Sequence, residues 1–477
     1  MVFSDLFFLY VFLPAFLVCY LLAGLIDKWI GKSVVVRNAI IVLFSLIFYA
    51  WGEPVYVLLM LASVLVNYFA GIGIAGSQGI HRKVALTVGV FNNIFILGLF
   101  KYAGFITHEL TGLGINVPVL DLRLPIGISF YIFQSISYLV DVYRRESPVQ
   151  RHFGGLLLYV SLFPQLIAGP IVRYGSIAKE ITHRRVTATD LADGLFRFLV
   201  GLGKKVIFAN QLSEISGQLL HDGFGSLTTT GAWVGIAAFT LQIYFDFSGY
   251  SDMAIGIGRC LGFHFRENFN HPYCCDSITD FWRRWHISLG SFFRDYVYIP
   301  LGGNRRHQPL NILIVWFLTG LWHGASWNFV IWGLYFGLIV MVEKYTLLRF
   351  HQRVPRLLLH LYCLLIVVAG WGIFYFDDFH AMQQFFRVSV GQGAAFHDFH
   401  TESAIFNYFY LWVAALVFCL PLRRWMEGWF DRLADRHAFL YGSLMLVYRF
   451  TASAVLLAVS TALLVGATNN AFIYTRF

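Results

Sequence analysis

Charge is scarce in this sequence, because only 13% of its 477 residues are Asp, Glu, Lys or Arg. A soluble globular domain carries roughly 25% charged residues, and no polar stretch here is long enough to form a separate soluble domain. Hydrophobic residues make up 58% of the chain, and the mean hydropathy is +0.65. The composition therefore excludes a soluble protein and predicts an all-α polytopic membrane protein.

Patterns for disulfides, metals and nucleic acid are also missing. The six cysteines are scattered at spacings typical of neither a disulfide framework nor a metal site, so we expect free thiols and no metal. The net charge is +9, yet no basic stretch is long enough to follow a phosphate backbone. The basic residues lie in short loops, which indicates cytoplasmic orientation and contact with membrane lipid. Nucleic acid is therefore not an expected partner.

Long apolar runs predict the membrane segments. At about 20 residues per span, we expect about ten to twelve segments, several of them broken. They form a single membrane-embedded domain over residues 1–477, with the motifs concentrated at about 125–345. The first run, Leu6–Ile26, is too long for a signal-peptide core and is followed by no small-residue cleavage site. We expect it to be a retained first helix.

Loop charges predict the orientation of these segments. The basic loops Asp27–Arg37 and Ser77–Lys83 are separated by two apolar runs, so both are expected in the cytoplasm. The N-terminus then lies outside, and the last apolar run, Thr451–Val465, leads to a tail that also lies outside. Two segments do not fit simple crossing.

Two apolar segments have basic residues on both sides, which a single crossing would not allow. Leu156–Ile171 contains Pro164 and Pro170, and each proline breaks or kinks a helix. We expect this segment to be re-entrant and to line a cavity, because non-helical backbone at membrane depth needs protein or water around it. Phe281–Leu301 carries three arginines and is expected to be an amphipathic or re-entrant helix with His286 pointing inward.

The most informative motif is Gly320–Asn328, which places His323 between the apolar runs Leu310–Leu321 and Phe329–Val342. We expect these runs to form a hairpin around the histidine. An ionisable side chain in a membrane is costly and usually faces a cavity where it has a function. The alternative is a helix-packing histidine bonded to a backbone carbonyl.

A second histidine makes the catalytic interpretation stronger. His286 lies in Phe281–Leu289 with two arginines and two tryptophans around it. A neutral imidazole can accept the proton of a hydroxyl near pH 7, and a desolvated site can stabilise an oxyanion. We therefore predict His323 and His286 as catalytic. No serine has the nucleophile-elbow pattern, which favours direct transfer or a nucleophile on a partner over an acyl-enzyme on this chain.

Other polar residues in apolar surroundings are candidates for binding. The arginine-rich region 283–306 could grip the phosphates of an acyl donor, and contact with lipid headgroups is the alternative. Polar residues on helix faces could line a tunnel, and interhelical hydrogen bonds or pairing of the aspartate with an arginine are the alternatives. The predicted donor-binding residues are Arg284, Arg294 and Asn304, and the predicted tunnel-lining residues are Gln134, Asp246, Trp322 and Asn328.

Several segments together resemble the membrane-bound O-acyltransferase (MBOAT) family, and more closely its bacterial branch that O-acetylates alginate, peptidoglycan and related polysaccharides. The similar segments are 124–131, 163–170, 244–255, 267–270, 281–304, 320–328 and 472–477. They occur in order over most of the chain.

The resemblance implies an acyl tunnel through the bacterial inner membrane, with the family's signature histidine at His323 and a second one at His286. It also implies acetyl-CoA as a cytoplasmic acetyl donor, with no bound cofactor. Periplasmic partner proteins would complete transfer to a glycan, and both termini would be periplasmic.

Two other classes of protein remain as alternatives. One is a polytopic transporter that exports a small polar solute and uses the re-entrant segments as gates. The sequence has no repeat period, whereas such transporters often show paired broken helices in two halves. The other is a haem or metal membrane protein, which would need histidines at matching depth on adjacent spans.

Overall fold

The computed structural model of this chain describes residues 1–221, 227–393, 395–467 and 472–473. Every helix or strand assigned within these ranges is a helix, which confirms the all-α prediction. Residues 474–477, and with them the predicted position of the C-terminus, lie outside the described residues.

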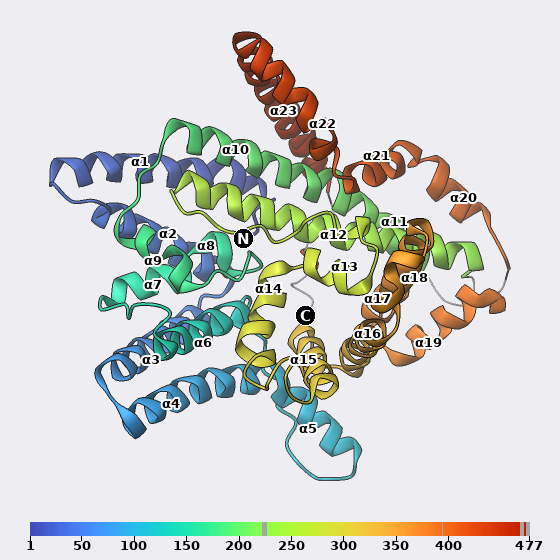
Figure 1. Cartoon of the computed structure of the whole chain (residues 1–477), viewed down its shortest axis with the longest axis horizontal. Helices are drawn as coiled ribbons and strands as arrows, with labels where there is room; N and C mark the ends of the chain where they lie inside the picture. Colours follow the sequence, from blue (N-terminus) through green and yellow to red (C-terminus); the bar gives the residue numbers. More distant parts are fainter. Residues whose placement is uncertain (222–226, 394, 468–471, 474–477) are drawn as a thin grey trace. The chain divides into compact units, whose positions relative to one another are not determined.

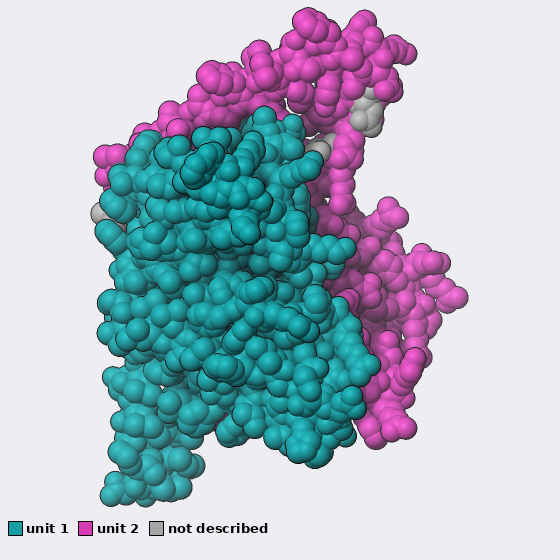
Figure 2. Space-filling view, turned by 90° about the vertical axis from the view of Figure 1, so that its left-hand side faces the viewer, with its two compact units in different colours: residues 1–198, 250–267, 474–477 teal, residues 199–249, 268–473 magenta. Residues whose placement is uncertain are grey.

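Contacts divide the chain into two compact units, coloured teal and magenta in Figure 2. Unit 1 comprises 1–198, 250–267 and 474–477, and unit 2 comprises 199–249 and 268–473. Two helices belong to both units: α10 (Ala188–Gly203) and α12 (Thr229–Cys260). The assignment of residues 1–477 to one membrane domain remains a prediction.

The helices of unit 1 follow one another through the first part of the chain (Figure 1). They are η1 (Phe8–Phe12), α1 (Leu13–Trp29), α2 (Val35–Gly52), α3 (Tyr56–Gly76), α4 (Gly79–Leu97), η2 (Gly98–Tyr102), α5 (Ala103–Gly112), α6 (Ile128–Arg144), α7 (Phe153–Ser161), α8 (Phe163–Leu166) and α9 (Tyr174–Thr182).

Unit 2 holds the remaining helices (Figure 1). They are η3 (Lys204–Asn210), α11 (Gln211–His221), η4 (Pro272–Cys274), α13 (Ile278–Arg284), α14 (Ile287–Phe293), η5 (Arg294–Tyr298), α15 (Gln308–His323), α16 (Trp327–Tyr345), α17 (Leu347–Phe350), η6 (His351–Arg353), α18 (Arg356–Tyr375), α19 (Phe379–Arg387), η7 (Val388–Gln392), α20 (Phe399–Phe406), α21 (Phe409–Cys419), α22 (Leu422–Arg436) and α23 (Ala438–Val465).

Seven helices among the described residues are long and apolar enough to cross a membrane, or eight if the bent pair α20–α21 is one span. The chain is thus polytopic. We expected about ten to twelve membrane segments from the length of a span. This larger number included segments that fold as shorter or broken helices. Among these, α6 has 17 residues and α15 has 16.

Both segments expected to be re-entrant are broken. In the first, α7 ends at Ser161, α8 begins at Phe163 with Pro164 in its first turn, and the backbone is non-helical from Ile167 to Arg173. The second is divided into α13, α14 and η5. The break in the first segment is confirmed, whereas the second was expected as one amphipathic or re-entrant helix and is instead divided. The return of each segment to the cytoplasmic side remains a prediction.

Small residues let helices of unit 1 pack closely. α3, α4 and α6 lie side by side (Figure 1). A Cβ on Gly71 would lie 2.7 Å from the hydroxyl of Tyr138, and one on Gly89 would lie 2.6 Å from Leu139 Cδ1. Side chains at these two glycines would therefore separate the helices.

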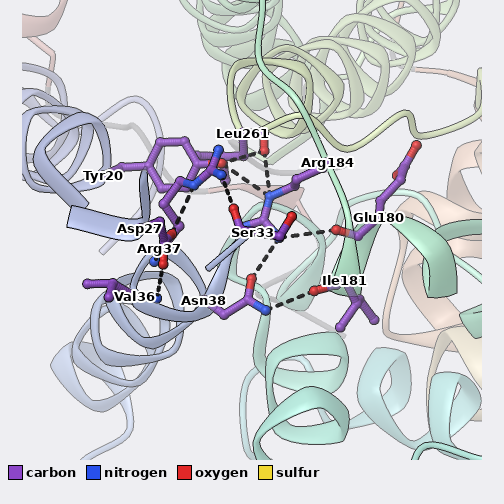
Figure 3. Close-up of polar contacts among 10 residues, drawn as sticks. All are labelled: Tyr20, Asp27, Ser33, Val36, Arg37, Asn38, Glu180, Ile181, Arg184 and Leu261. Carbon is purple, nitrogen blue, oxygen red and sulfur yellow. Dashed lines mark hydrogen bonds and ion pairs between the residues drawn. The ribbon is translucent and has the colours of Figure 1, made fainter. Parts of the chain in front are cut away.

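A buried arginine joins four segments of unit 1 (Figure 3). Arg184 is only 6% exposed, and its Nε donates to the carbonyl of Leu261 at 2.9 Å and to the hydroxyl of Tyr20 at 3.2 Å. Its Nη1 donates to Asn38 Oδ1 at 2.6 Å and to the carbonyl of Glu180 at 3.2 Å. Arg184 is therefore a connection between α1, α2, α9 and the end of α12.

The start of α2 is held by a buried carboxylate in the same region (Figure 3). Asp27 is fully buried and accepts hydrogen bonds from the backbone N–H groups of Val36 at 2.8 Å and Arg37 at 3.2 Å. A carboxylate at this place satisfies the unpaired N–H groups of the first turn and interacts favourably with the helix dipole.

In unit 2, α15 and α16 form the predicted hairpin, with Gly324, Ala325 and Ser326 between them. The two helices touch where they lack side chains. A Cβ on Gly320 would lie 2.3 Å from the carbonyl oxygen of Phe329, and the Cα atom of Gly333 would be 3.3 Å away. This contact brings the end of α15 against the first turns of α16.

We expect Gly320→Ala to destabilise the protein, because its Cβ cannot be accommodated without separating α15 from α16. The matched control is Gly442→Ala in α23, where an added Cβ meets nothing within 4 Å. This control should be neutral or stabilising by up to about 1 kcal/mol, the helix preference of alanine over glycine. Thermal unfolding of both purified variants in detergent measures the difference. Equal melting temperatures for the two variants would contradict the close contact.

Candidate active site

His323 is the last residue of α15, at the tip of the hairpin in unit 2. Its side chain is buried and surrounded by aromatic rings. The ring centroids of Trp332 and Phe374 lie 4.9 and 5.2 Å from that of the imidazole, both edge to face. Phe329 stacks on it at 6.4 Å. The hairpin therefore places the imidazole among aromatic rings.

His286 lies between α13 and α14, where the backbone turns sharply. Its φ is +44°, in the left-handed region that is uncommon for residues other than glycine. The neighbouring backbone is held by Asn268, whose carbonyl accepts from Ile287 N at 2.9 Å and whose Oδ1 accepts from Ser288 N at 3.0 Å. Residues fixed in sparsely populated conformations often occur at functional sites.

A single tryptophan contacts both histidines. The centroid of the Trp322 ring lies 5.9 Å from that of His286 and 4.9 Å from that of His323, both edge to face. The rings of Phe247 and Phe269 complete the surroundings of His286 at 6.5 and 6.3 Å. The structure thus brings together the two histidines that the sequence separates, with Trp322 as their shared neighbour.

His286 is poorly suited to act as a base. Burial lowers the pKa of His286 well below its ordinary value, because an apolar environment disfavours the charged imidazolium. His286 is therefore neutral at pH 7 and a weak base. A general base works best when its pKa lies near the working pH, so His286 is better suited to hydrogen bonding than to proton abstraction.

A buried glutamate connects the hairpin to the segment that carries His286. Glu343 lies near the end of α16 and is 1% exposed. Its Oε1 accepts from Ile278 N at 2.7 Å, and its Oε2 accepts from Thr279 N and Oγ1 at 2.7 and 2.6 Å. The carboxylate thereby caps α13, so that α13 is fixed on the helix that follows His323.

The predicted donor-binding residues lie at the surface of unit 2. Arg284 ends α13 and pairs with Asp280, with its Nε 2.8 Å from Oδ2. Arg294 begins η5 and is 63% exposed, with Asp295 as its partner. Asn304 accepts hydrogen bonds through Oδ1, from the hydroxyl of Tyr298 at 2.7 Å among others.

The predicted tunnel-lining residues have different surroundings. Asp246 is 1% exposed and forms an ion pair with Lys205 Nζ at 2.6 Å, while its Oδ2 accepts from Ile473 N at 2.8 Å. Asn328 is buried at the start of α16 and accepts from the hydroxyl of Ser326. Its Nδ2 has no hydrogen-bond partner among the described residues.

Gln134 belongs to unit 1 and is fully buried in α6. Its side-chain amide has no hydrogen-bond partner among the described residues. The backbone carbonyl of Gln134 accepts a hydrogen bond from the hydroxyl of Ser137 at 2.8 Å. An unpaired amide in an apolar interior costs about 1–3 kcal/mol. The lining roles of Gln134, Asp246, Trp322 and Asn328 remain predictions.

Three positioning residues were missed in the sequence: Glu343, Asn268 and Lys205. Asn268 belongs to one of the similar segments, but nothing local indicated its bond to the backbone at His286. Glu343 and Lys205 each carry a charge beside an apolar run. A charge in such a place needs a buried partner, and this was the feature of the sequence that could have identified them as positioning residues. Among the described residues no group of three or more His, Cys, Asp or Glu could hold a metal ion.

The sequence matches the model of a protein family described as MBOAT, membrane-bound O-acyltransferase family, over residues 127–382. This range begins near the start of the predicted core, 125–345, and extends beyond its end. It includes both histidines and the whole hairpin.

Individual relatives are similar over most of the chain. A probable alginate O-acetylase, AlgI, of Azotobacter vinelandii is 42% identical over 385 residues, which cover 78% of this chain and 75% of the relative. A peptidoglycan O-acetyltransferase of Helicobacter pylori is 34% identical over 420 residues, with 79% of each chain covered. A teichoic acid D-alanyltransferase of Bacillus subtilis is 26% identical over 282 residues, with 53% of this chain and 66% of the relative covered.

We expect Glu343→Gln to destabilise the protein by about 1–3 kcal/mol, the cost of a buried donor without an acceptor. The side-chain NH₂ group of the glutamine would face the backbone N–H of Ile278 or Thr279, so two hydrogen-bond donors would face each other without an acceptor. Thermal unfolding in detergent measures the loss, and the control is Glu402→Gln, whose side chain is 54% exposed. If both variants unfold at the wild-type melting temperature, the hydrogen bonds of Glu343 do not contribute to the stability of the protein.

Proposed function

This chain belongs to the membrane-bound O-acyltransferase family, and we propose that it passes acetyl groups from a cytoplasmic donor across the bacterial inner membrane for O-acetylation of an extracytoplasmic polysaccharide. The observation that carries the proposal is the enclosed His323 beside His286 in the matched region. The family match supports an acyltransferase and argues against the exporting transporter. The names of the relatives support acetyl transfer to a glycan such as alginate or peptidoglycan.

In the proposed reaction, His323 is the general base. Its imidazole accepts the proton of the acceptor hydroxyl while the hydroxyl oxygen attacks the carbonyl carbon of the acetyl thioester. The carbon–sulfur bond then breaks, and the imidazolium returns the proton to the thiolate that leaves. Aromatic rings around His323 exclude water, which strengthens hydrogen bonds to the developing oxyanion. A buried side chain with an unpaired donor, such as the amide of Asn328, suits this place.

His286 serves in this scheme as a neutral hydrogen-bonding group. Its lowered pKa prevents it from carrying positive charge at pH 7, and its contact with Trp322 places it one ring away from His323. It is suited to orient the donor or acceptor within the tunnel.

Acetyl-CoA is the proposed donor, and it would approach from the cytoplasmic side. Arg284 and Arg294 each have one acidic partner and retain further N–H groups, and a guanidinium can bind phosphate through two parallel hydrogen bonds. The side chain of Asn304 lies 3.1 Å from Lys344 Nζ, which adds a positive charge. Periplasmic partner proteins would complete transfer to the glycan, with the N- and C-termini on their side of the membrane.

We expect His323→Ala to lower acetyl transfer by about 10²–10⁴-fold, the usual effect of removing a positioned base. The control is His380→Ala, an exposed histidine on α19, which should keep wild-type activity. Transfer of labelled acetyl groups from acetyl-CoA by membranes that contain equal amounts of each variant measures both. Activity of His323→Ala within a few-fold of wild type would contradict the assignment.

We expect Arg284→Ala to raise the KM for acetyl-CoA, with activity partly restored by excess donor. The same excess should not restore His323→Ala, because occupancy cannot replace a missing proton acceptor. Steady-state assays over a range of acetyl-CoA concentrations distinguish the two variants. The control is Arg432→Ala, at an exposed position on α22. If Arg284 only anchors α13 at lipid headgroups, its substitution will lower the yield of protein and leave the KM unchanged.

A further inference from the structure

The turn between α13 and α14 (Figure 1) carries His286 and is held by the segment before η4. Asn270 N donates to the carbonyl of Arg284 at 3.0 Å, and Ile287 N donates to the carbonyl of Asn268 at 2.9 Å. The buried side chain of Asn268 bonds the turn as well, through Oδ1. These bonds fix the place of the imidazole, and its chemistry then depends on which of its two nitrogens carries the proton.

A row of polar groups leads from Asn268 to the imidazole. Asn268 Oδ1 lies 3.0 Å from Ser288 N and 2.9 Å from Ser288 Oγ. A backbone N–H can only donate, so the Asn268 atom at this place is the oxygen and not the amide nitrogen. The hydroxyl of Ser288 has a single proton, and Asn268 Oδ1 is closer to Oγ than His286 Nδ1, which lies at 3.4 Å. The hydroxyl therefore donates to Asn268, at the distance of a normal hydrogen bond.

Toward His286, the hydroxyl oxygen of Ser288 then presents a lone pair. A lone pair on Nδ1 would repel it, whereas a proton on Nδ1 turns the 3.4 Å contact into a long but favourable hydrogen bond. A neutral imidazole has one donor nitrogen and one acceptor nitrogen, and burial keeps this ring neutral because it lowers the pKa of His286. Nε2, at the end of the ring away from its own backbone, is therefore the acceptor.

We propose that Ser288 and Asn268 are positioning residues that hold His286 in its Nδ1–H form, so that Nε2 accepts a hydrogen bond from an N–H or O–H group of a bound substrate. The role in acetyl transfer rests on the proposed function, whereas the form of the ring does not. An Nε2 without a proton cannot donate to the carbonyl oxygen of a thioester. His286 thus orients a substrate for His323, and stabilisation of the oxyanion belongs to other donors, such as the amide of Asn328.

The proton on Nδ1 can be observed directly by nuclear magnetic resonance. The full-length protein is prepared with histidine that carries ¹⁵N at Nδ1 only, and is placed in lipid nanodiscs without acetyl donor. Solid-state spectra at pH 7 separate protonated from unprotonated ring nitrogens, and the signal that disappears in His286→Gln belongs to His286. We expect a protonated Nδ1 in the wild type. An unprotonated Nδ1 would overturn the proposal.

Variants of Ser288 test its part in this arrangement. Ser288→Ala removes the acceptor, so the ratio of the Nδ1–H form to the Nε2–H form should fall by about 2–10-fold, the effect of one hydrogen bond. Ser288→Thr keeps the hydroxyl and should keep the wild-type ratio. The matched control is Ser291→Ala, which removes a hydroxyl one turn further along α14, where Ser291 Oγ donates to the carbonyl of Ser288 at 2.8 Å. Equal ratios in Ser288→Ala and the wild type, or equal falls in Ser288→Ala and Ser291→Ala, would contradict the role of Ser288.

Asn268 is tested through the same signal. In Asn268→Ala the hydroxyl of Ser288 becomes able to donate to Nδ1 as well as to accept from it, so the ratio should fall by a similar factor. An unchanged ratio would contradict the role of Asn268. Because no donor is present, these spectra do not depend on whether the chain transfers acetyl groups.

Acetyl transfer tests the use that the reaction makes of Nε2. We expect Ser288→Ala to lower kcat/KM by about the factor by which it lowers the ratio of the two ring forms, and Ser288→Thr to restore the wild-type value. Wild-type transfer by Ser288→Ala, together with the expected change in its spectrum, would overturn the proposed orientation of a substrate by His286.

Discussion

The hydrogen bonds of Glu343 set the frame in which both histidines lie. One carboxylate at the end of α16 accepts from two backbone N–H groups and one hydroxyl at the start of α13. The hairpin ends α15 at His323, and α13 leads to His286. Loss of this carboxylate would leave α13 held to the hairpin by ring contacts such as those of Trp282 with Trp316 and Trp332. The geometry of the site therefore depends in part on a residue that takes no part in the chemistry.

Buried charges throughout the chain follow the same physical rule. An unpaired charge in an apolar interior is very costly, and two buried charges among the described residues have such partners. Arg184 binds four groups from separate segments of unit 1, and Lys205 pairs with Asp246 in unit 2. These pairs and networks act as specific connections between helices whose apolar surfaces would otherwise pack in many ways.

Aromatic rings surround both histidines. Rings around His286 lower its pKa and make it a hydrogen-bonding group, while His323 lies at the hairpin tip and is the proposed base. Trp322 contacts both rings and couples their positions.

Much of this could be predicted from local sequence. Scarce charge and long apolar runs predict a polytopic helical protein, proline positions predict the break at 156–171, and the Gly320–Asn328 motif predicts a hairpin around His323, because each depends on neighbours in the chain. The contact of His286 and His323 with Trp322, the cap of Glu343 and the burial of Arg184 were decided only by the tertiary structure. A local pattern shows that a buried charge needs a partner, but only the packing of distant helices determines which residue that partner is.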